Sequence, residues 1–90
     1  YSIIKHGVVG MTKYFAALFA QDGIRVNMIS PGPIFNDNPK NLVKELKRII
    51  PMNRLGKKDY LLPSLKFLMD DKNAYITGQN IVIDGGRTII

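Results

Sequence analysis

Two short apolar segments, separated by a stretch long enough for two helices, constrain the fold of this chain more than any other feature. Residues 24–30 and 79–84 are rich in Ile and Val and are bounded by Gly and Pro, as strands commonly are. Apolar residues at helical spacing predict helices over about 39–50 and 58–70, and another over 1–21. Strands joined by helical crossovers pair in parallel, so this order (helix, strand, helix, helix, strand) predicts an α/β fold.

The predicted sheet is incomplete by itself. Parallel sheets are normally covered on both faces and contain more than two strands, whereas this chain offers two. The sequence also begins inside a helical pattern, without an initiator Met. We therefore expect residues 1–90 to be the C-terminal part of a larger, doubly wound parallel sheet.

Local signals refine the predicted helices. Gly23 suits the left-handed conformation that ends a helix, so it should end the first one. Pro63 is tolerated only within the first turn of the third helix. Gly7 and Gly10 each cost about 1 kcal/mol relative to Ala inside a helix. They therefore predict close approach of another backbone to the first helix.

Composition excludes several classes of function. The chain has no Cys, which rules out disulfides and thiolate metal sites, and no apolar run approaches the ~20 residues that span a bilayer. The net charge is +6, but the densest basic run, residues 40–48, alternates with apolar residues. That pattern favours a solvated helix face over a nucleic-acid surface. His6 and Asp70-Asp71 lack companions at metal-ligand spacing. We expect a cytoplasmic protein without a metal, nucleic-acid or membrane partner.

Tyr1 and Lys5 are four residues apart, a spacing that places two side chains on one face of a helix. A phenol has a pKa of about 10, and lowering it to ~7 requires about 4 kcal/mol. An ammonium at ~4 Å supplies about that much at an effective dielectric constant of ~20. The pair can thus act as an acid/base couple. Taken alone, the pair is more typical of an ordinary helix surface.

Three motifs occur together in this chain. They are Tyr1-Ser2-Ile3-Ile4-Lys5, then Ser30-Pro31-Gly32-Pro33-Ile34, and finally Thr77-Gly78 leading to Asp84-Gly85-Gly86. In this order they resemble the C-terminal part of a short-chain dehydrogenase/reductase, and the resemblance covers nearly the whole chain. It implies a Rossmann-like fold and an oxidoreductase that uses NAD or NADP. Such an enzyme transfers hydride between nicotinamide and the carbon of a small-molecule alcohol or ketone.

The resemblance also implies roles for the Tyr-Lys pair. Tyr1 would be the general acid/base, and Lys5 would lower its pKa and hydrogen-bond the nicotinamide ribose. Ser2 is adjacent to Tyr1 and is not the catalytic serine of the family, which lies upstream together with the glycine-rich fingerprint. We therefore expect the isolated 90 residues to be inactive.

The Pro-Gly loop is the second implied part of the site. Ligands of open α/β sheets bind beyond the carboxyl ends of the strands, where this loop lies. The resemblance makes Pro31, Gly32 and Ile34 contacts of the nicotinamide end, with Gly32 leaving room for a flat ring. Asn36 stands where the family often has Thr. We expect Asn36 to contact the cofactor only because its side chain offers both a hydrogen-bond donor and an acceptor.

Residues 37–58 correspond in the resemblance to a substrate lid. Five apolar side chains in or beside this region could line a pocket or pack on their own domain: Phe35, Leu42, Leu46, Met52 and Leu55. The apolar C-terminal strand favours a homo-oligomer, a tetramer by analogy.

Two alternatives to an active oxidoreductase stay open. The chain could be an inactive binding or structural module of the same fold, or a fragment without activity of its own.

Overall fold

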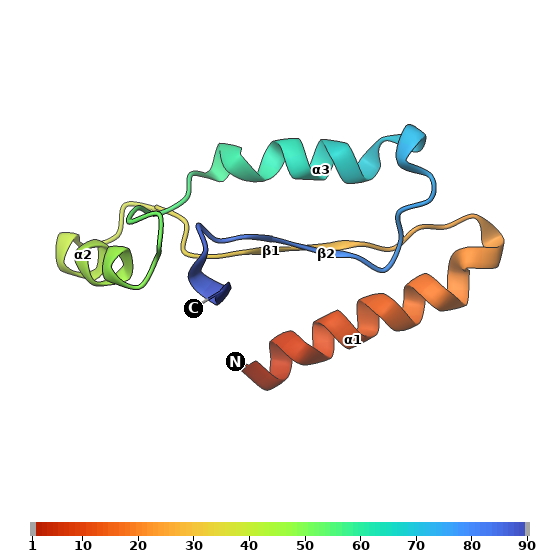
Figure 1. Cartoon of the computed structure of the whole chain (residues 1–90), viewed down its shortest axis with the longest axis horizontal. Helices are drawn as coiled ribbons and strands as arrows, with labels where there is room; N and C mark the ends of the chain where they lie inside the picture. The colour runs from red at the N-terminus through yellow and green to blue at the C-terminus, as the bar shows by residue number, and fades with distance from the viewer. Residues whose placement is uncertain (1, 90) are drawn as a thin grey trace.

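The computed structural model describes the backbone of residues 2–89 and the side chains of residues 3–89. Its helices and strands are α1 (Ser2–Phe19), β1 (Met28–Pro31), α2 (Lys40–Arg48), α3 (Leu62–Met69) and β2 (Asn80–Ile83). The connections between them contain the 3-10 turns η1 (Ala20–Asp22), η2 (Lys58–Leu61) and η3 (Asp71–Asn73), and η4 (Arg87–Ile89) follows β2. α1 and α3 lie on opposite faces of the sheet, and α2 lies beyond one end of it (Figure 1).

The two strands pair in parallel, as the sequence predicts. Met28 lies opposite Asn80 and Pro31 opposite Ile83. The Gly32 N–H extends the ladder by donating to the Ile83 carbonyl at 2.9 Å. Since paired parallel strands run the same way, both carboxyl ends lie at one end of the sheet, together with the start of α1 (Figure 1).

The segment before β1 is not a strand, contrary to the prediction that the strand starts at residue 24. Its polar groups are instead bonded to loops far along the chain. The Arg25 guanidinium donates to the Leu68 carbonyl at 2.9 Å, near the end of α3. Asn27 donates to the Ile76 carbonyl and accepts from the Gln79 N–H. The backbone of Val26 makes two separate bonds, accepting from the Gly78 N–H at 2.7 Å and donating to the Thr77 hydroxyl at 3.1 Å.

The helix predictions hold, with shifted ends. The predicted helix over 58–70 is divided into η2 and α3, which places Pro63 at the start of α3, where it is tolerated. Gly23 has φ 74°, the left-handed conformation expected for it. The close approach expected at Gly7 and Gly10 is absent within the described residues, because a Cβ on either would meet nothing within 4 Å.

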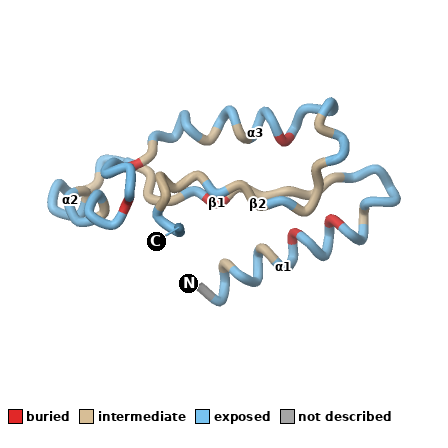
Figure 2. The backbone as a smooth tube through the Cα atoms, viewed as in Figure 1, coloured by how far each residue is buried: buried red, intermediate tan, exposed pale blue. Residues whose placement is uncertain are grey.

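Few side chains are buried. The buried apolar residues are Ala16, Ile50, Leu55 and Leu68 (Figure 2). α1 is anchored on the sheet side by Ala16 and by Thr12, whose hydroxyl lies 3.4 Å from the Met28 sulfur. The apolar stripe that predicted this helix lies largely outside that contact, since its members are exposed: Ile4, Val8, Met11, Phe15 and Leu18. α1 therefore presents a second, uncovered apolar face.

Two adjacent isoleucines allow a matched test of this packing. Ile50 is 4% exposed and its side chain lies against Gly85, whereas Ile49 is 41% exposed. We expect Ile50→Ala to lower the free energy of unfolding by about 2–4 kcal/mol, since it leaves a cavity. Ile49→Ala should cost under about 1 kcal/mol. Urea unfolding of both variants measures the difference, and equal losses would contradict this packing.

Candidate active site

A cavity of about 580 Å³ lies at the carboxyl ends of both strands. We call it the Lys5 cavity. Its lining includes Lys5 from the first turns of α1, residues 31–33 at the end of β1, and Asp84 and Arg87 after β2. The structure thus brings together three residues predicted from sequence: Lys5, Pro31 and Gly32. Tyr1 lies outside the described residues.

Gly32 has a structural reason that the sequence analysis did not identify. A Cβ on Gly32 would lie 2.6 Å from Asp84 Cβ and 2.8 Å from Asp84 Cα. The missing side chain therefore makes room for the chain after β2. Gly32 permits the two strand ends to approach each other, and this approach places Asp84 in the Lys5 cavity.

Asp84 is a site residue that the sequence reasoning missed. Its carboxylate accepts three hydrogen bonds, from the Gly86 N–H at 2.9 Å, the Thr88 N–H at 3.0 Å and the Thr88 hydroxyl at 2.8 Å. Gly85 and Gly86 have φ 65° and 94°, so the turn requires glycine at both positions. An Asp followed by two glycines and a Thr is a local turn signal that could have indicated this arrangement.

The charge of Asp84 is stabilised by its surroundings. Desolvation opposes ionisation. The Thr88 hydroxyl, the N–H groups of Gly86 and Thr88, and the positive charge of Lys5 outweigh it, so the pKa of Asp84 lies below its ordinary value. Asp84 is therefore a carboxylate at neutral pH, and it lines the same cavity as Lys5.

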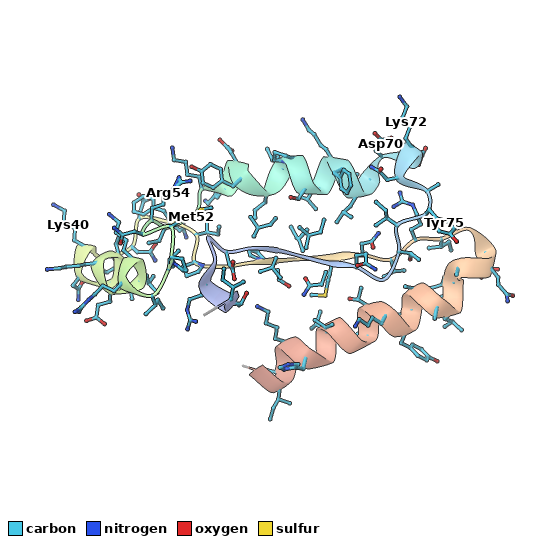
Figure 3. All side chains as sticks on the ribbon, viewed as in Figure 1. Lys40, Met52, Arg54, Asp70, Lys72 and Tyr75 are labelled. Atoms are coloured by element: carbon cyan, nitrogen blue, oxygen red, sulfur yellow. The ribbon has the colours of Figure 1, made fainter. Side chains whose placement is uncertain are left out.

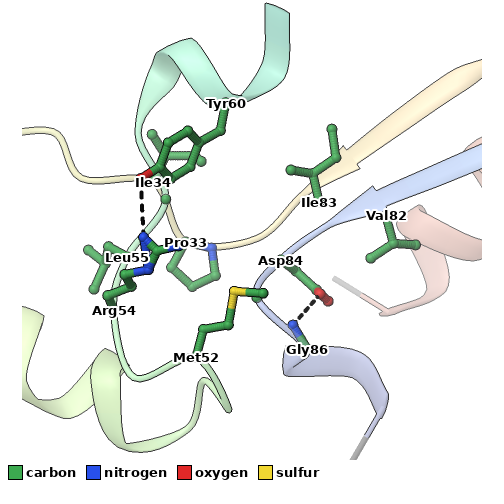
Figure 4. Close-up of a pocket in the computed structure, with 12 residues that line it drawn as sticks. Pro33, Ile34, Met52, Arg54, Leu55, Tyr60, Val82, Ile83, Asp84 and Gly86 are labelled. Carbon is green, nitrogen blue, oxygen red and sulfur yellow. Dashed lines mark hydrogen bonds between the residues drawn. The ribbon is translucent and has the colours of Figure 1, made fainter. Parts of the chain in front are cut away.

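A second cavity, of about 450 Å³, lies beside the first (Figure 4). We call it the Arg54 pocket. It shares Pro33 and Asp84 with the Lys5 cavity and is bounded on the far side by Arg54 and Tyr60. Figure 3 places Arg54 and Met52 in the connection between α2 and α3, at the carboxyl end of the sheet.

Two predicted cofactor contacts do not line the Lys5 cavity. Ile34 lines the Arg54 pocket, where it bridges in parallel to Gly56. Asn36 is exposed, and its N–H donates to the Asn38 side chain at 2.9 Å.

The predicted lid region contributes to the Arg54 pocket through Met52 and Leu55. Leu55 is buried, whereas Phe35 and Leu42 are 49% and 42% exposed. The pocket-lining interpretation therefore holds for the segment after α2. Leu46 is half-buried in α2, and no residue of this helix lines either cavity.

Among the described residues, no three His, Cys, Asp or Glu side chains are grouped so that they could hold a metal ion. None of the described helices has the length and apolar character needed to cross a membrane.

Comparison with known proteins defines the class. A family model described as enoyl-(acyl carrier protein) reductase matches residues 1–88. The oxidoreductase UcpA of Escherichia coli is 36% identical over 101 residues, which cover 99% of this chain and 38% of UcpA. The chain spans about 38% of the length of the curated relatives it matches.

Solved structures agree with this assignment. A short-chain dehydrogenase from Leptospira borgpetersenii, solved with bound NAD+, superposes with a TM-score of 0.90 at 40% identity, over 98% of this chain and 35% of its own. ElxO, solved with NADP bound, superposes with a TM-score of 0.83 at 32% identity, over 96% of this chain and 38% of its own. The chain belongs to the short-chain dehydrogenase/reductase family of oxidoreductases. Its fold corresponds to the C-terminal part of their Rossmann-like sheet.

A pair of glycine substitutions tests the contact between the strand ends. Gly32→Ala should lower the free energy of unfolding by about 1–3 kcal/mol, because overpacking displaces the chain at Asp84. Gly10→Ala is the control: it meets nothing within 4 Å in α1 and should stabilise by about 0.5–1 kcal/mol. Thermal and urea unfolding measure both. A neutral Gly32→Ala variant would show that the strand ends are further apart.

Acid titration tests the environment of Asp84. Its folded pKa is lowered, so its contribution to stability is complete above the unfolded value of about 3.9 and is lost as pH falls through the folded value. Thr88→Val removes the hydroxyl donor and should raise the pKa of Asp84, which shrinks the loss of stability between about pH 5 and pH 3. Thr88→Ser keeps the donor and should resemble the wild type. NMR titration of the Asp84 carboxyl carbon reads the pKa directly; identical values in all three proteins would refute this account.

Proposed function

We propose that this chain forms the nicotinamide-facing, acid/base-bearing part of an NAD- or NADP-dependent enzyme that interconverts an alcohol and a carbonyl compound. The carrying observation is the position of Lys5. It lines a cavity at the carboxyl ends of two parallel strands, against the Pro-Gly loop. Open α/β sheets bind ligands at that edge.

The residues of the Lys5 cavity suit the nicotinamide-ribose half of such a cofactor. A lysine ammonium offers three hydrogen-bond donors to ribose hydroxyls. The volume of about 580 Å³ lies within the range of small-molecule sites. When bound, the nicotinamide ring supplies or accepts the hydride. Solved relatives with NAD+ and with NADP support either cofactor for this family.

Side chains of this chain then carry out the proton transfer. Tyr1 precedes Lys5 by four residues in the sequence and, in this proposal, gives a proton to the carbonyl oxygen or takes one from the alcohol. Lys5 lowers the Tyr1 pKa through its charge and orients the ribose. Backbone groups of Pro31, Gly32 and Ile34 hold the carboxamide, and Asn36 adds a polar contact at the same edge.

The proposal extends to the whole protein. The sheet has two strands here, and the matching relatives are longer, so we place these 90 residues within a longer polypeptide that supplies the remaining cofactor contacts. The uncovered apolar face of α1, with Val82 at 44% and Ile89 at 82% exposure, supports a homo-oligomer, a tetramer by analogy. Residues 37–58 act as the substrate lid, and the substrate is a small alcohol or ketone.

Two substitutions in the complete polypeptide separate the roles of the pair. Tyr1→Phe should lower kcat by about 10²–10⁴-fold and leave cofactor affinity unchanged, because the phenol oxygen carries only the proton. Lys5→Met should weaken cofactor binding by about tenfold to a hundredfold, because a charge-assisted hydrogen bond is lost. It should also move the rising limb of the pH–rate profile to higher pH.

The matched control is Lys13→Met, which removes an exposed lysine from the same helix. It should change neither quantity. Cofactor fluorescence titration gives Kd, and rates at saturating cofactor give the pH profile. The proposal fails if Lys5→Met and Lys13→Met behave alike, or if Tyr1→Phe keeps half of the wild-type rate.

A further inference from the structure

The Arg54 pocket is largely apolar with one cationic side. Its apolar walls come from Ile34, Met52, Leu55, Val82 and Ile83. A volume of about 450 Å³ is typical of small-molecule sites, which combine apolar walls with a few polar groups.

Backbone hydrogen bonds frame this pocket on three sides. The Met52 N–H donates to the Gly85 carbonyl at 3.1 Å, which ties the segment after α2 to the turn after β2. The Gly56 N–H donates to the Pro33 carbonyl at 3.0 Å, and its own carbonyl accepts from the Phe35 N–H at 2.9 Å. These bonds join three separate loops, so the pocket is preformed by the backbone.

Arg54 is held in place by Tyr60. The guanidinium lies over the Tyr60 ring at 5.5 Å from its centre and donates to the Tyr60 hydroxyl at 3.1 Å. Within the described residues, Tyr60 is its only hydrogen-bonding or ring partner, and no carboxylate pairs with it. A guanidinium has five N–H donors, so several remain for a ligand. The stacked geometry orients them in advance.

Asp84 is the acidic residue of the pocket lining, but it does not oppose an anion at Arg54. Both of its carboxylate oxygens accept hydrogen bonds from Gly86 or Thr88. Figure 4 shows Asp84 and Gly86 on the side of the pocket away from Arg54 and Tyr60. Arg54 is therefore the charge that a ligand in this pocket would meet.

We propose that the Arg54 pocket binds an amphipathic anion. The apolar chain of the ligand packs between Ile34, Met52 and Val82, and its head group, a carboxylate or a phosphate monoester, is held by Arg54. Both head groups accept paired hydrogen bonds from a guanidinium. The inference concerns binding alone and stands apart from hydride transfer, so it is measured without a nicotinamide cofactor.

The experiment compares three ligands with alkyl chains of equal length by isothermal titration calorimetry of the complete polypeptide. They are decanoate, decyl phosphate and decanol. At least one anion should bind about tenfold to a hundredfold more tightly than decanol, and the tighter anion identifies the head group. Arg54→Gln should remove that preference and leave decanol affinity unchanged. Arg48→Gln, the same charge change on the exposed face of α2, should keep it.

Two results overturn the proposal. One is a wild-type protein that binds decanol as tightly as both anions. The other is an Arg54→Gln variant that loses all three probes equally, which assigns Arg54 a structural role. A second measurement needs no variant of Arg54: the ε-methyl NMR signal of Met52, assigned with Met52→Leu, should shift when the preferred anion saturates the protein. An unshifted signal places the ligand elsewhere and also overturns the proposal.

Discussion

The parallel pairing of β1 with β2 is the constraint on which the rest of the structure depends. It joins segments about fifty residues apart and places Pro31 opposite Ile83. Two loops therefore leave the sheet at the same edge, where Gly32 lies against Asp84. The Lys5 cavity and the Arg54 pocket both use Pro33 and Asp84 as walls, so both exist only while this edge is intact.

Different interactions hold the two ends of the sheet. At the amino end, side chains hydrogen-bond to backbone groups. Arg25 donates to carbonyls near the end of α3, and the Asn27 side chain accepts from the Gln79 N–H. At the carboxyl end, the contacts are close backbone approaches that only glycine permits. Both ends also contain glycines in the left-handed conformation: Gly78 at φ 73° before β2, and Gly85 and Gly86 at 65° and 94° after it.

Sequence reasoning succeeded where the signals are local and periodic. Helical spacing located α1, α2 and α3, and Gly23 marked the end of the first. It failed where the cause lies far along the chain: nothing near Arg25 shows that its partners are residues 68–76. Gly32 lines the Lys5 cavity, but its contact with Asp84 could not be predicted without the register of the sheet.

The same limit applies to the side chains of the two cavities. The turn formed by Asp84 and Thr88 carried a local signal that could have been used. The Arg54–Tyr60 pair carried none, because its members are six positions apart without a regular helix between them and only the fold brings them together. Lys5 was predicted because helical spacing connects it to Tyr1, and the cavity that it lines became visible only with the sheet in place.

The central claim is that Lys5 and the Pro-Gly loop form the nicotinamide-ribose site. A crystal structure of the complete polypeptide with bound NADH or NADPH tests it most directly. The account predicts the Lys5 Nζ within about 2.7–3.2 Å of a ribose hydroxyl oxygen, with the nicotinamide ring beside residues 31–34. A ribose bound outside the Lys5 cavity, with Lys5 in solvent, would contradict it.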